Sequence, residues 1–314
     1  MNLYDRVTKT IIRQLEEKPD RLPWHGELNI PANFYTKHCY QGVNAINLWA
    51  QAMLNAHPTH LWATERQWGL MGATIKNNEE PTDVVYFNPG KKETVDSGLG
   101  GKIAIAQYGD SHARAWEIFN YAQVEGCKRT PPQPVKSATG KRRKPQTLYI
   151  EADPDTFIDR AEEFFEAQDA HVVTKGDDHF KAQGCVAYYS KSLDRIYMPH
   201  YSKFEDASSY YSVLGHEHIH WTGAKDRLNR LKGCYLASPE YAFEELVAEL
   251  GAAFICASLG IENMPRPDHA RYIRSWISGI KHDNRLIFKA ASKAQRAEDW
   301  MFEKVTPVEM KRAA

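Results

Sequence analysis

The sequence predicts an α+β protein of two domains, a small α+β domain in residues 1–126 and a mostly helical domain with a small β-sheet in residues 146–314. Three observations predict this class. The length of 314 residues suggests two domains at about 150 residues each. In both regions, apolar residues recur at the spacings typical of amphipathic helices and of strands. A basic, proline-rich segment at residues 127–145 lies between them.

The composition excludes several classes of protein. Hydrophobic residues make up 42% of the chain, enough for real cores, so a wholly disordered chain is excluded. The most apolar stretch, residues 246–259, is too short to span a bilayer. The N-terminal residues lack the pattern of a signal peptide. We therefore expect a cytoplasmic protein without membrane association, whose five scattered cysteines are reduced thiols.

Helices and strands are both expected in the first region. Apolar residues at every fourth position predict an amphipathic helix that ends before Pro19: Leu3, Val7, Ile11 and Leu15. A second helix is expected at residues 43–56. A third follows Thr64, with Gln67 at the spacing of a capping box. Strand-like stretches follow at residues 84–87, 102–106 and 114–119.

The segment at residues 127–145 carries seven basic and no acidic side chains. It cannot bury enough apolar surface to offset the entropy of ordering, so it is expected to be a flexible linker. Its charges are either simply solvated or in contact with a polyanion. The region before it carries 12 basic and 14 acidic side chains, and the region after it 21 and 26.

The second region is expected to be mainly helical. A helix at residues 157–168 precedes a β-hairpin of strands near residues 186–189 and 195–198. The next helix spans about 206–220. Another starts at Ser238-Pro239, where an N-cap residue precedes a proline at the first helical position, and it ends near Gly260. Helices then fill residues 267–304.

The strongest chemical signal is the HExxH pattern HEHIH at residues 216–220. The spacing places His216 and His220 on one helix face one turn apart, so both imidazoles reach one metal ion. Glu217 beside them is the candidate general base. Chance gives such a pattern only roughly 0.04 times in a chain of this composition. The alternative is a helix with exposed histidines. His218 is expected to point elsewhere on the helix, at the surface or as an outer partner of a ligand.

The following helix offers the third ligand. Glu245 and Glu249 share one face, so one carboxylate binds the metal while the other bonds a ligand histidine. We assign Glu245 as ligand and Glu249 as its partner, and the reverse assignment remains open. Small residues on this helix would allow close packing: Ala248, Gly251, Ala252 and Ala253.

This donor set predicts Zn2+ as the cofactor, although Mn2+ or another divalent metal also suits two histidines and a glutamate. Such a site hydrolyses peptides when a base activates water, and the hairpin offers an edge for an extended substrate. Four residues are unranked candidates for a second oxyanion donor: Tyr197, His200, Tyr201 and Arg227.

Longer stretches resemble a known family. Two stretches of the second region resemble the zincin-like metallopeptidase domain of plasmid proteins: YSVLGHEHIHWTGAKDRLNR and FEELVAELGAAFICASLGI. Four stretches of the first region resemble the single-stranded-DNA-binding domain of ArdC antirestriction proteins and TraC primases: LPWHG, YQGVNAINLW, ATERQWGLMGATIKNNEE and EIFNYAQVEG. Together they resemble the ArdC family. The resemblance implies a conjugation-associated plasmid protein that binds single-stranded DNA and helps it to escape restriction, with metal ligands at His216, His220 and Glu245 and a base at Glu217. His218 replaces an aliphatic residue that is common in the family.

Without the resemblance, DNA binding has modest support. The first region is slightly acidic, which argues against strong attraction to phosphates. Its aromatic residues can stack on unpaired bases, although most tryptophans, Trp49 among them, are expected in the core. The candidate DNA contacts are Trp24, Tyr40, Asn44, Arg66, Gln67 and Lys76.

Two functions remain open at this level. In the first, the protein shields single-stranded DNA and the metal site is secondary or structural. In the second, a metallopeptidase is brought to DNA and cleaves a DNA-bound or restriction protein, its possible protein substrate.

Overall fold

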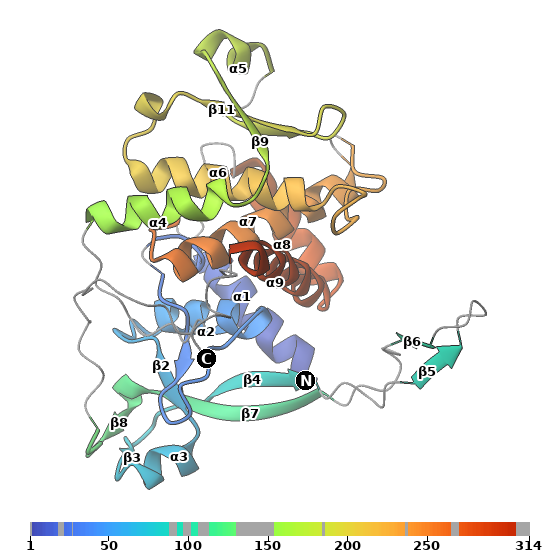
Figure 1. Ribbon diagram of the computed structural model, residues 1–314. Helices are drawn as coiled ribbons and strands as arrows, with labels where there is room; N and C mark the ends of the chain where they lie inside the picture. The colour runs from blue at the N-terminus through green and yellow to red at the C-terminus, as the bar shows by residue number, and fades with distance from the viewer. Residues whose placement is uncertain are drawn as a thin grey trace.

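The computed structural model describes residues 2–17, 22–26, 28–87, 93–96, 102–105, 113–129, 154–183, 186–235, 238–264 and 270–305. Helices and strands occur in both halves, which confirms the α+β class (Figure 1). Most of the basic segment lies outside the described residues, so its flexibility and the domain boundaries stay predictions.

The N-terminal half combines helices with a mixed sheet, in which one strand pair is parallel and the others are antiparallel. Its helices are α1 (Leu3–Glu17), α2 (Val43–Leu54), α3 (Glu65–Leu70) and the 3-10 turn η1 (Tyr121–Gln123). The main sheet has the order β1-β2-β7-β4, from Ala32–Asn33, Leu61–Ala63, Ala113–Asn120 and Thr82–Phe87. Two further pairs join β3 (Thr74–Ile75) to β8 (Val124–Glu125) and β5 (Glu93–Asp96) to β6 (Lys102–Ile105).

Local sequence explains where the helices of this half start. The Thr64 side chain accepts a hydrogen bond from the Gln67 backbone, and the Gln67 side chain accepts one from the Thr64 backbone. This reciprocal pair confirms the expected capping box. The apolar side chains predicted for α1 are buried at Val7, Ile11 and Leu15.

The C-terminal half is mainly helical. Its helices are α4 (Pro154–Glu166), α5 (Asp177–Gln183), η2 (Tyr201–Lys203), α6 (Ala207–Thr222), α7 (Pro239–Leu259), α8 (Ala270–His282) and α9 (Leu286–Val305). The expected hairpin joins β10 (Tyr188–Ser190) to β11 (Arg195–Pro199). A third strand, β9 (His171–Lys175), pairs parallel with β11, so β11 is the central strand. The sequence analysis missed β9, which is mostly exposed and lacks a buried face.

Helices α6 and α7 begin at side-chain caps. Asp206 accepts a hydrogen bond from the Ser209 backbone at 2.7 Å, and Ser238 accepts one from the Tyr241 backbone at 3.0 Å. Helix α7 ends at Gly260, whose φ of 74° is left-handed and favours glycine. The starts predicted from Ser238-Pro239 and the stop at Gly260 are confirmed.

Small residues let α6 and α7 pack closely. A Cβ atom at Gly251 would stand 2.7 Å from the Ile219 side chain, so any larger residue there would force Ile219 to move. At the end of α6, a Cβ at Gly223 would stand 2.9 Å from Leu231. The expected role of small residues on α7 is confirmed at Gly251.

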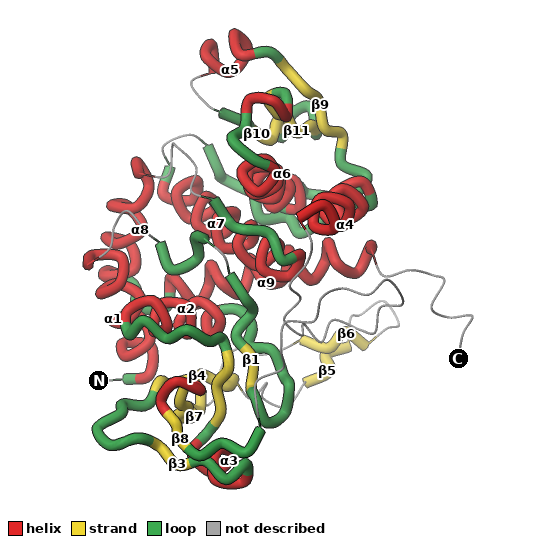
Figure 2. The backbone as a smooth tube through the Cα atoms, turned by 90° about the vertical axis from the view of Figure 1, so that its left-hand side faces the viewer, coloured by secondary structure: helices red, strands yellow, loops and turns green. Residues whose placement is uncertain are grey.

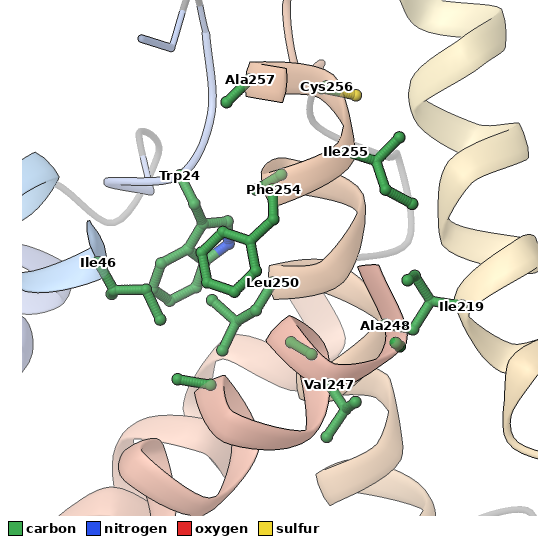
Figure 3. Packing of buried hydrophobic residues seen from close by; sticks show 14 of the residues in the cluster. Trp24, Ile46, Ile219, Val247, Ala248, Leu250, Phe254, Ile255, Cys256 and Ala257 are labelled. Carbon is green, nitrogen blue, oxygen red and sulfur yellow. The ribbon is translucent and has the colours of Figure 1, made fainter. Parts of the chain in front are cut away.

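One hydrophobic core joins the two halves. Residues of α1 and α2 belong to the same buried cluster as residues of α7, α8 and α9. Figure 3 shows Trp24 and Ile46 against Leu250 and Phe254 of α7. Polar contacts add to it, since the Gly42 backbone donates to the Gln295 side chain at 3.1 Å. Separate halves would each expose part of this apolar surface to water.

We expect a chain that is cut within residues 127–145 to remain a single folded particle, because the shared core holds the halves together. Size-exclusion chromatography after cleavage at an inserted protease site measures this. Elution of two folded fragments in the absence of denaturant would contradict it.

Candidate metal centre

The two histidines of the HExxH pattern lie in the last turns of α6 and face each other. The Nε2 atoms of His216 and His220 are 3.1 Å apart. Both side chains are largely buried. Helix α6 lies between α7 and the small sheet (Figure 1). The helical spacing therefore produces the expected pair on one face.

Glu245 of α7 completes a group of three possible ligands. Its Oε1 lies 3.3 Å from Nε2 of His220, and its Oε2 lies 3.5 Å from Nε2 of His216. Among the described residues, these three side chains form the one group of histidine, cysteine and carboxylate atoms gathered closely enough for a metal.

The separations suit a single divalent ion. Ligand atoms about 2.0–2.1 Å from a tetrahedral metal stand roughly 3.3–3.4 Å from one another. The observed edges of 3.1, 3.3 and 3.5 Å bracket this value. Two neutral imidazoles and a carboxylate are also the donor types that zinc and manganese accept.

Each candidate histidine has a second carboxylate behind it. Glu249 Oε2 lies 3.5 Å from Nδ1 of His216, and Glu244 Oε1 lies 3.5 Å from Nδ1 of His220. Because Glu249 stands on the Nδ1 side, away from the three facing ligand atoms, the geometry favours Glu245 as ligand and Glu249 as partner. Such carboxylates orient a ligand imidazole and raise its basicity.

Cationic or donor groups hold these two carboxylates in turn. The Arg230 guanidinium donates to both oxygens of Glu244, at 2.9 and 3.2 Å. Nε2 of His25, from the N-terminal half, lies 2.6 Å from Oε1 of Glu249. Sequence reasoning missed Glu244, His25 and Arg230. Glu244 could have been suspected only because it is next to Glu245 in the sequence. His25 could not, since it lies 224 positions from its partner Glu249.

The buried carboxylates favour a positive charge between the helices. Burial lowers the pKa of His220, but hydrogen bonds with Glu244 and Glu245 outweigh it and raise that pKa to about 10. Burial by itself would raise the pKa of Glu245, but its hydrogen bonds with the two histidines have the larger effect and lower the pKa well below that of an ordinary glutamate. The site therefore attracts a cation.

Glu217 and His218 differ in role. Glu217 is buried beside His216, consistent with the proposed base. His218 points elsewhere, as expected, but it is fully buried, so the expected surface position is wrong. Its Nδ1 donates to the Leu214 carbonyl at 2.8 Å, and its ring lies 4.8 Å from that of Phe165. Burial lowers the pKa of His218 to about 4, so it packs as a neutral ring.

The four oxyanion candidates separate by their surroundings. Arg227 pairs with Asp194, donates to Tyr189 at 3.1 Å and lies over the Trp221 ring, so its guanidinium connects α6 to the hairpin.

Tyr197 is buried in a ring stack with Tyr188. Tyr201 and His200 are exposed on η2 and before it. The side chains of Arg227 and Tyr197 are therefore already engaged in contacts that stabilise the fold.

Several candidate DNA contacts have structural roles. Trp24 is fully buried, with 0% of its surface exposed, so it offers no face to a base, and the structure contradicts that interpretation. Asn44 bonds both backbone groups of Val85 in β4. Trp49 is buried, as expected.

The remaining candidates lie nearer the surface. Gln67 caps α3 and accepts a hydrogen bond from Asn33, which also donates to the Tyr40 hydroxyl at 3.2 Å. Lys76 donates to the Ala122 carbonyl at 2.7 Å, and Arg66 is exposed. Of these, Arg66 and Lys76 remain in contact with solvent.

Comparisons with known proteins cover both halves. The family model for the N-terminal domain of anti-restriction factor ArdC matches residues 1–130, and that for a zincin-like metallopeptidase matches residues 159–293.

Two crystal structures of the antirestriction protein ArdC from plasmid R388 are similar over almost the whole chain. The metal-free structure has a TM-score of 0.71 at 31% identity, covering 97% of this chain and 98% of that one. The Mn(II)-bound structure has a TM-score of 0.72 at 30% identity, covering 98% and 100%.

The chain belongs to the ArdC antirestriction family.

This membership confirms the resemblance seen in the sequence, including a zincin-like domain after the ArdC N-terminal domain. The uncharacterized protein y4eC of Sinorhizobium fredii is 36% identical over 305 residues, covering 96% of this ArdC-family chain and 91% of y4eC. DNA primase TraC of Escherichia coli is 30% identical over 313 residues, which is 95% of this chain and 27% of TraC. Within the described residues, none of the helices has the length and apolar character needed to cross a bilayer.

We expect the purified protein to bind one divalent ion, and His216→Ala to lose it, because that change removes one of three ligands. Elemental analysis after dialysis against zinc or manganese measures the ratio of metal to chain. His282→Ala, at an exposed histidine on α8, is the matched control. Unchanged metal content in His216→Ala would remove the assignment.

His25→Ala is expected to weaken metal affinity by roughly 10- to 100-fold, the usual cost of losing an outer partner of a ligand. The reason is that Glu249 loses the group that holds it against His216. Isothermal titration with Zn2+ or Mn2+ measures the change. His25→Gln, which keeps a donor, should restore much of the affinity, whereas equal affinity in all three proteins would show that His25 serves packing alone.

Proposed function

We propose that this ArdC-family protein binds single-stranded DNA through its N-terminal half during conjugation, protects that DNA from restriction, and holds a divalent metal in a metallopeptidase-type centre. The observation that carries the metal centre is the convergence of His216, His220 and Glu245. Zinc is the chemical default for this donor set. The Mn(II)-bound ArdC structure supports manganese as the alternative.

Two histidines, a carboxylate ligand and a neighbouring glutamate are the residue types that metal-assisted peptide hydrolysis uses. When bound, a divalent ion supplies Lewis acidity that polarises a carbonyl group. We infer that Glu217, which is buried and follows His216 in the sequence, takes a proton from the attacking water and delivers it to the leaving amine. Glu244 and Glu249 keep the two imidazoles oriented.

DNA binding rests on the N-terminal half. The match to the ArdC N-terminal domain and the likeness to DNA primase TraC support it. The slightly acidic balance of residues 1–126 predicts modest affinity and little dependence on base sequence. The seven basic side chains of residues 127–145 would add attraction to phosphates.

The second candidate is a DNA-targeted peptidase that cleaves a DNA-bound or restriction protein. It is favoured by the completeness of the site, in which the base, the ligands and their partners are all present. We favour shielding as the main activity, since coating a strand needs only the N-terminal half, and a metal site can also serve to tie two helices together.

We expect Glu217→Gln to keep metal, fold and DNA binding and to protect plasmid DNA as well as the original protein does, because the change removes only the base. Conjugation into a restricting host measures protection, and anisotropy of a labelled oligonucleotide measures DNA binding. A control strain without the gene sets the unprotected level. Loss of protection with DNA binding intact would make the peptidase the working activity.

A further inference from the structure

Two large aromatic side chains lie exposed on neighbouring strands of the N-terminal sheet. Trp116 of β7 is 55% exposed, and Tyr86 of β4 is 58% exposed. Strands β4 and β7 lie side by side, on the far side of α1 and α2 from α6 and α7, in both Figure 1 and Figure 2. Exposed rings of this size are unusual on a protein surface and mark contact sites when they gather.

The register places both rings on the same face. Tyr86 is opposite Arg114, and Val84 is opposite Trp116. Directly opposite residues share a face, so Tyr86 and Trp116 are diagonal neighbours, with Cβ atoms roughly 7–8 Å apart or less. Further along the face, Val84 and Ile118 are buried with Leu48 and Trp62, which anchors the strands rigidly.

Charge is divided between the two faces of this strand pair. The face with the aromatic rings carries Arg114 and no carboxylate from either strand. The opposite face carries Asp83 and Glu117, which stand across from each other. Asp83 is paired with Arg6 of α1 at 2.9 Å. The described part of the chain contains no ion-pair partner for Arg114, so its charge remains available to a ligand.

We propose that Tyr86, Trp116 and Arg114 form a base-stacking site for single-stranded DNA, which we name the β4–β7 platform. This inference rests on the proposed function and identifies where that binding occurs. Two rings on rigid strands accept two unpaired bases, and the guanidinium contacts the adjoining phosphate. Duplex DNA cannot use the rings, since its bases are already stacked on one another.

A competing position exists at the other end of the sheet. Tyr35 is 38% exposed, and the Arg129 guanidinium lies 5.7 Å from its ring centre. Its neighbour Phe34 is buried, so this position offers a single exposed ring. The β4–β7 platform offers two rings and a cation together, which favours it as the place where bases stack.

A protein partner is the other class of occupant for an exposed aromatic face. The single-sign charge beside the rings favours a polyanion, because a protein surface would have to leave Arg114 uncompensated or supply a carboxylate for it. Binding of a protein is therefore an outcome of the test and not the proposal.

The test measures the Kd of the full chain for a labelled oligothymidine by anisotropy. We expect Trp116→Ala to weaken binding by roughly 5- to 150-fold, the loss that accompanies removal of one stacking ring. Tyr86→Ala should act similarly, and Trp116→Phe should keep most of the affinity. Arg114→Gln should weaken binding less and reduce its dependence on salt. Tyr235→Ala, at an exposed ring between α6 and α7, is the matched control and should not change Kd.

Each outcome is distinct. If the original chain fails to bind oligothymidine, the proposed function fails. If it binds and the Trp116 and Tyr86 variants bind equally well while their melting temperatures are unchanged, the platform is wrong. Weakened binding in Tyr35→Ala alone would place the DNA at the competing position and would overturn the platform. Equal loss of duplex and single-strand binding would show a charge effect without stacking and would also overturn it.

Discussion

The packing of α7 against α6 depends on three carboxylates buried in one helix. Glu244, Glu245 and Glu249 are each almost fully excluded from water. Buried charges of one sign are costly unless positive groups compensate them. Here Arg230 pairs with Glu244, the imidazoles of His216 and His220 lie against Glu245, and Nε2 of His25 lies against Glu249. A divalent cation at the centre would supply positive charge among these carboxylates while the ligand imidazoles stay neutral, which is why a metal suits the site.

The same packing unites the two halves of the chain. Since α7 is apolar or carboxylate-bearing around most of its circumference, every face of it must be covered. Helix α6 covers the face with Gly251, and Trp24 and Ile46 cover the face with Phe254. The N-terminal half therefore supplies part of the core and, through His25, part of the metal site's outer layer.

This arrangement has a consequence for function. A change in the N-terminal half that moves His25 would alter how Glu249 holds His216, so this contact links the N-terminal half to the candidate metal site. The β4–β7 strands lie on the other side of α1 and α2, while the metal centre lies between α6 and α7 (Figure 1). The proposed β4–β7 platform is thus separated from the candidate metal centre, with α1 and α2 between them.

The sequence by itself determined features whose causes are local. Helical spacing placed His216 and His220 on one face, capping residues marked the starts of α3 and α7, and Gly260 marked a helix end. Tertiary structure decided what depends on distant residues. No local pattern shows that His25 meets Glu249, that β9 adds to the hairpin, or that Trp24 is buried while Trp116 is exposed. An aromatic side chain has the same sequence signature in a core and on a surface, and only the packing of other elements against it settles which it becomes.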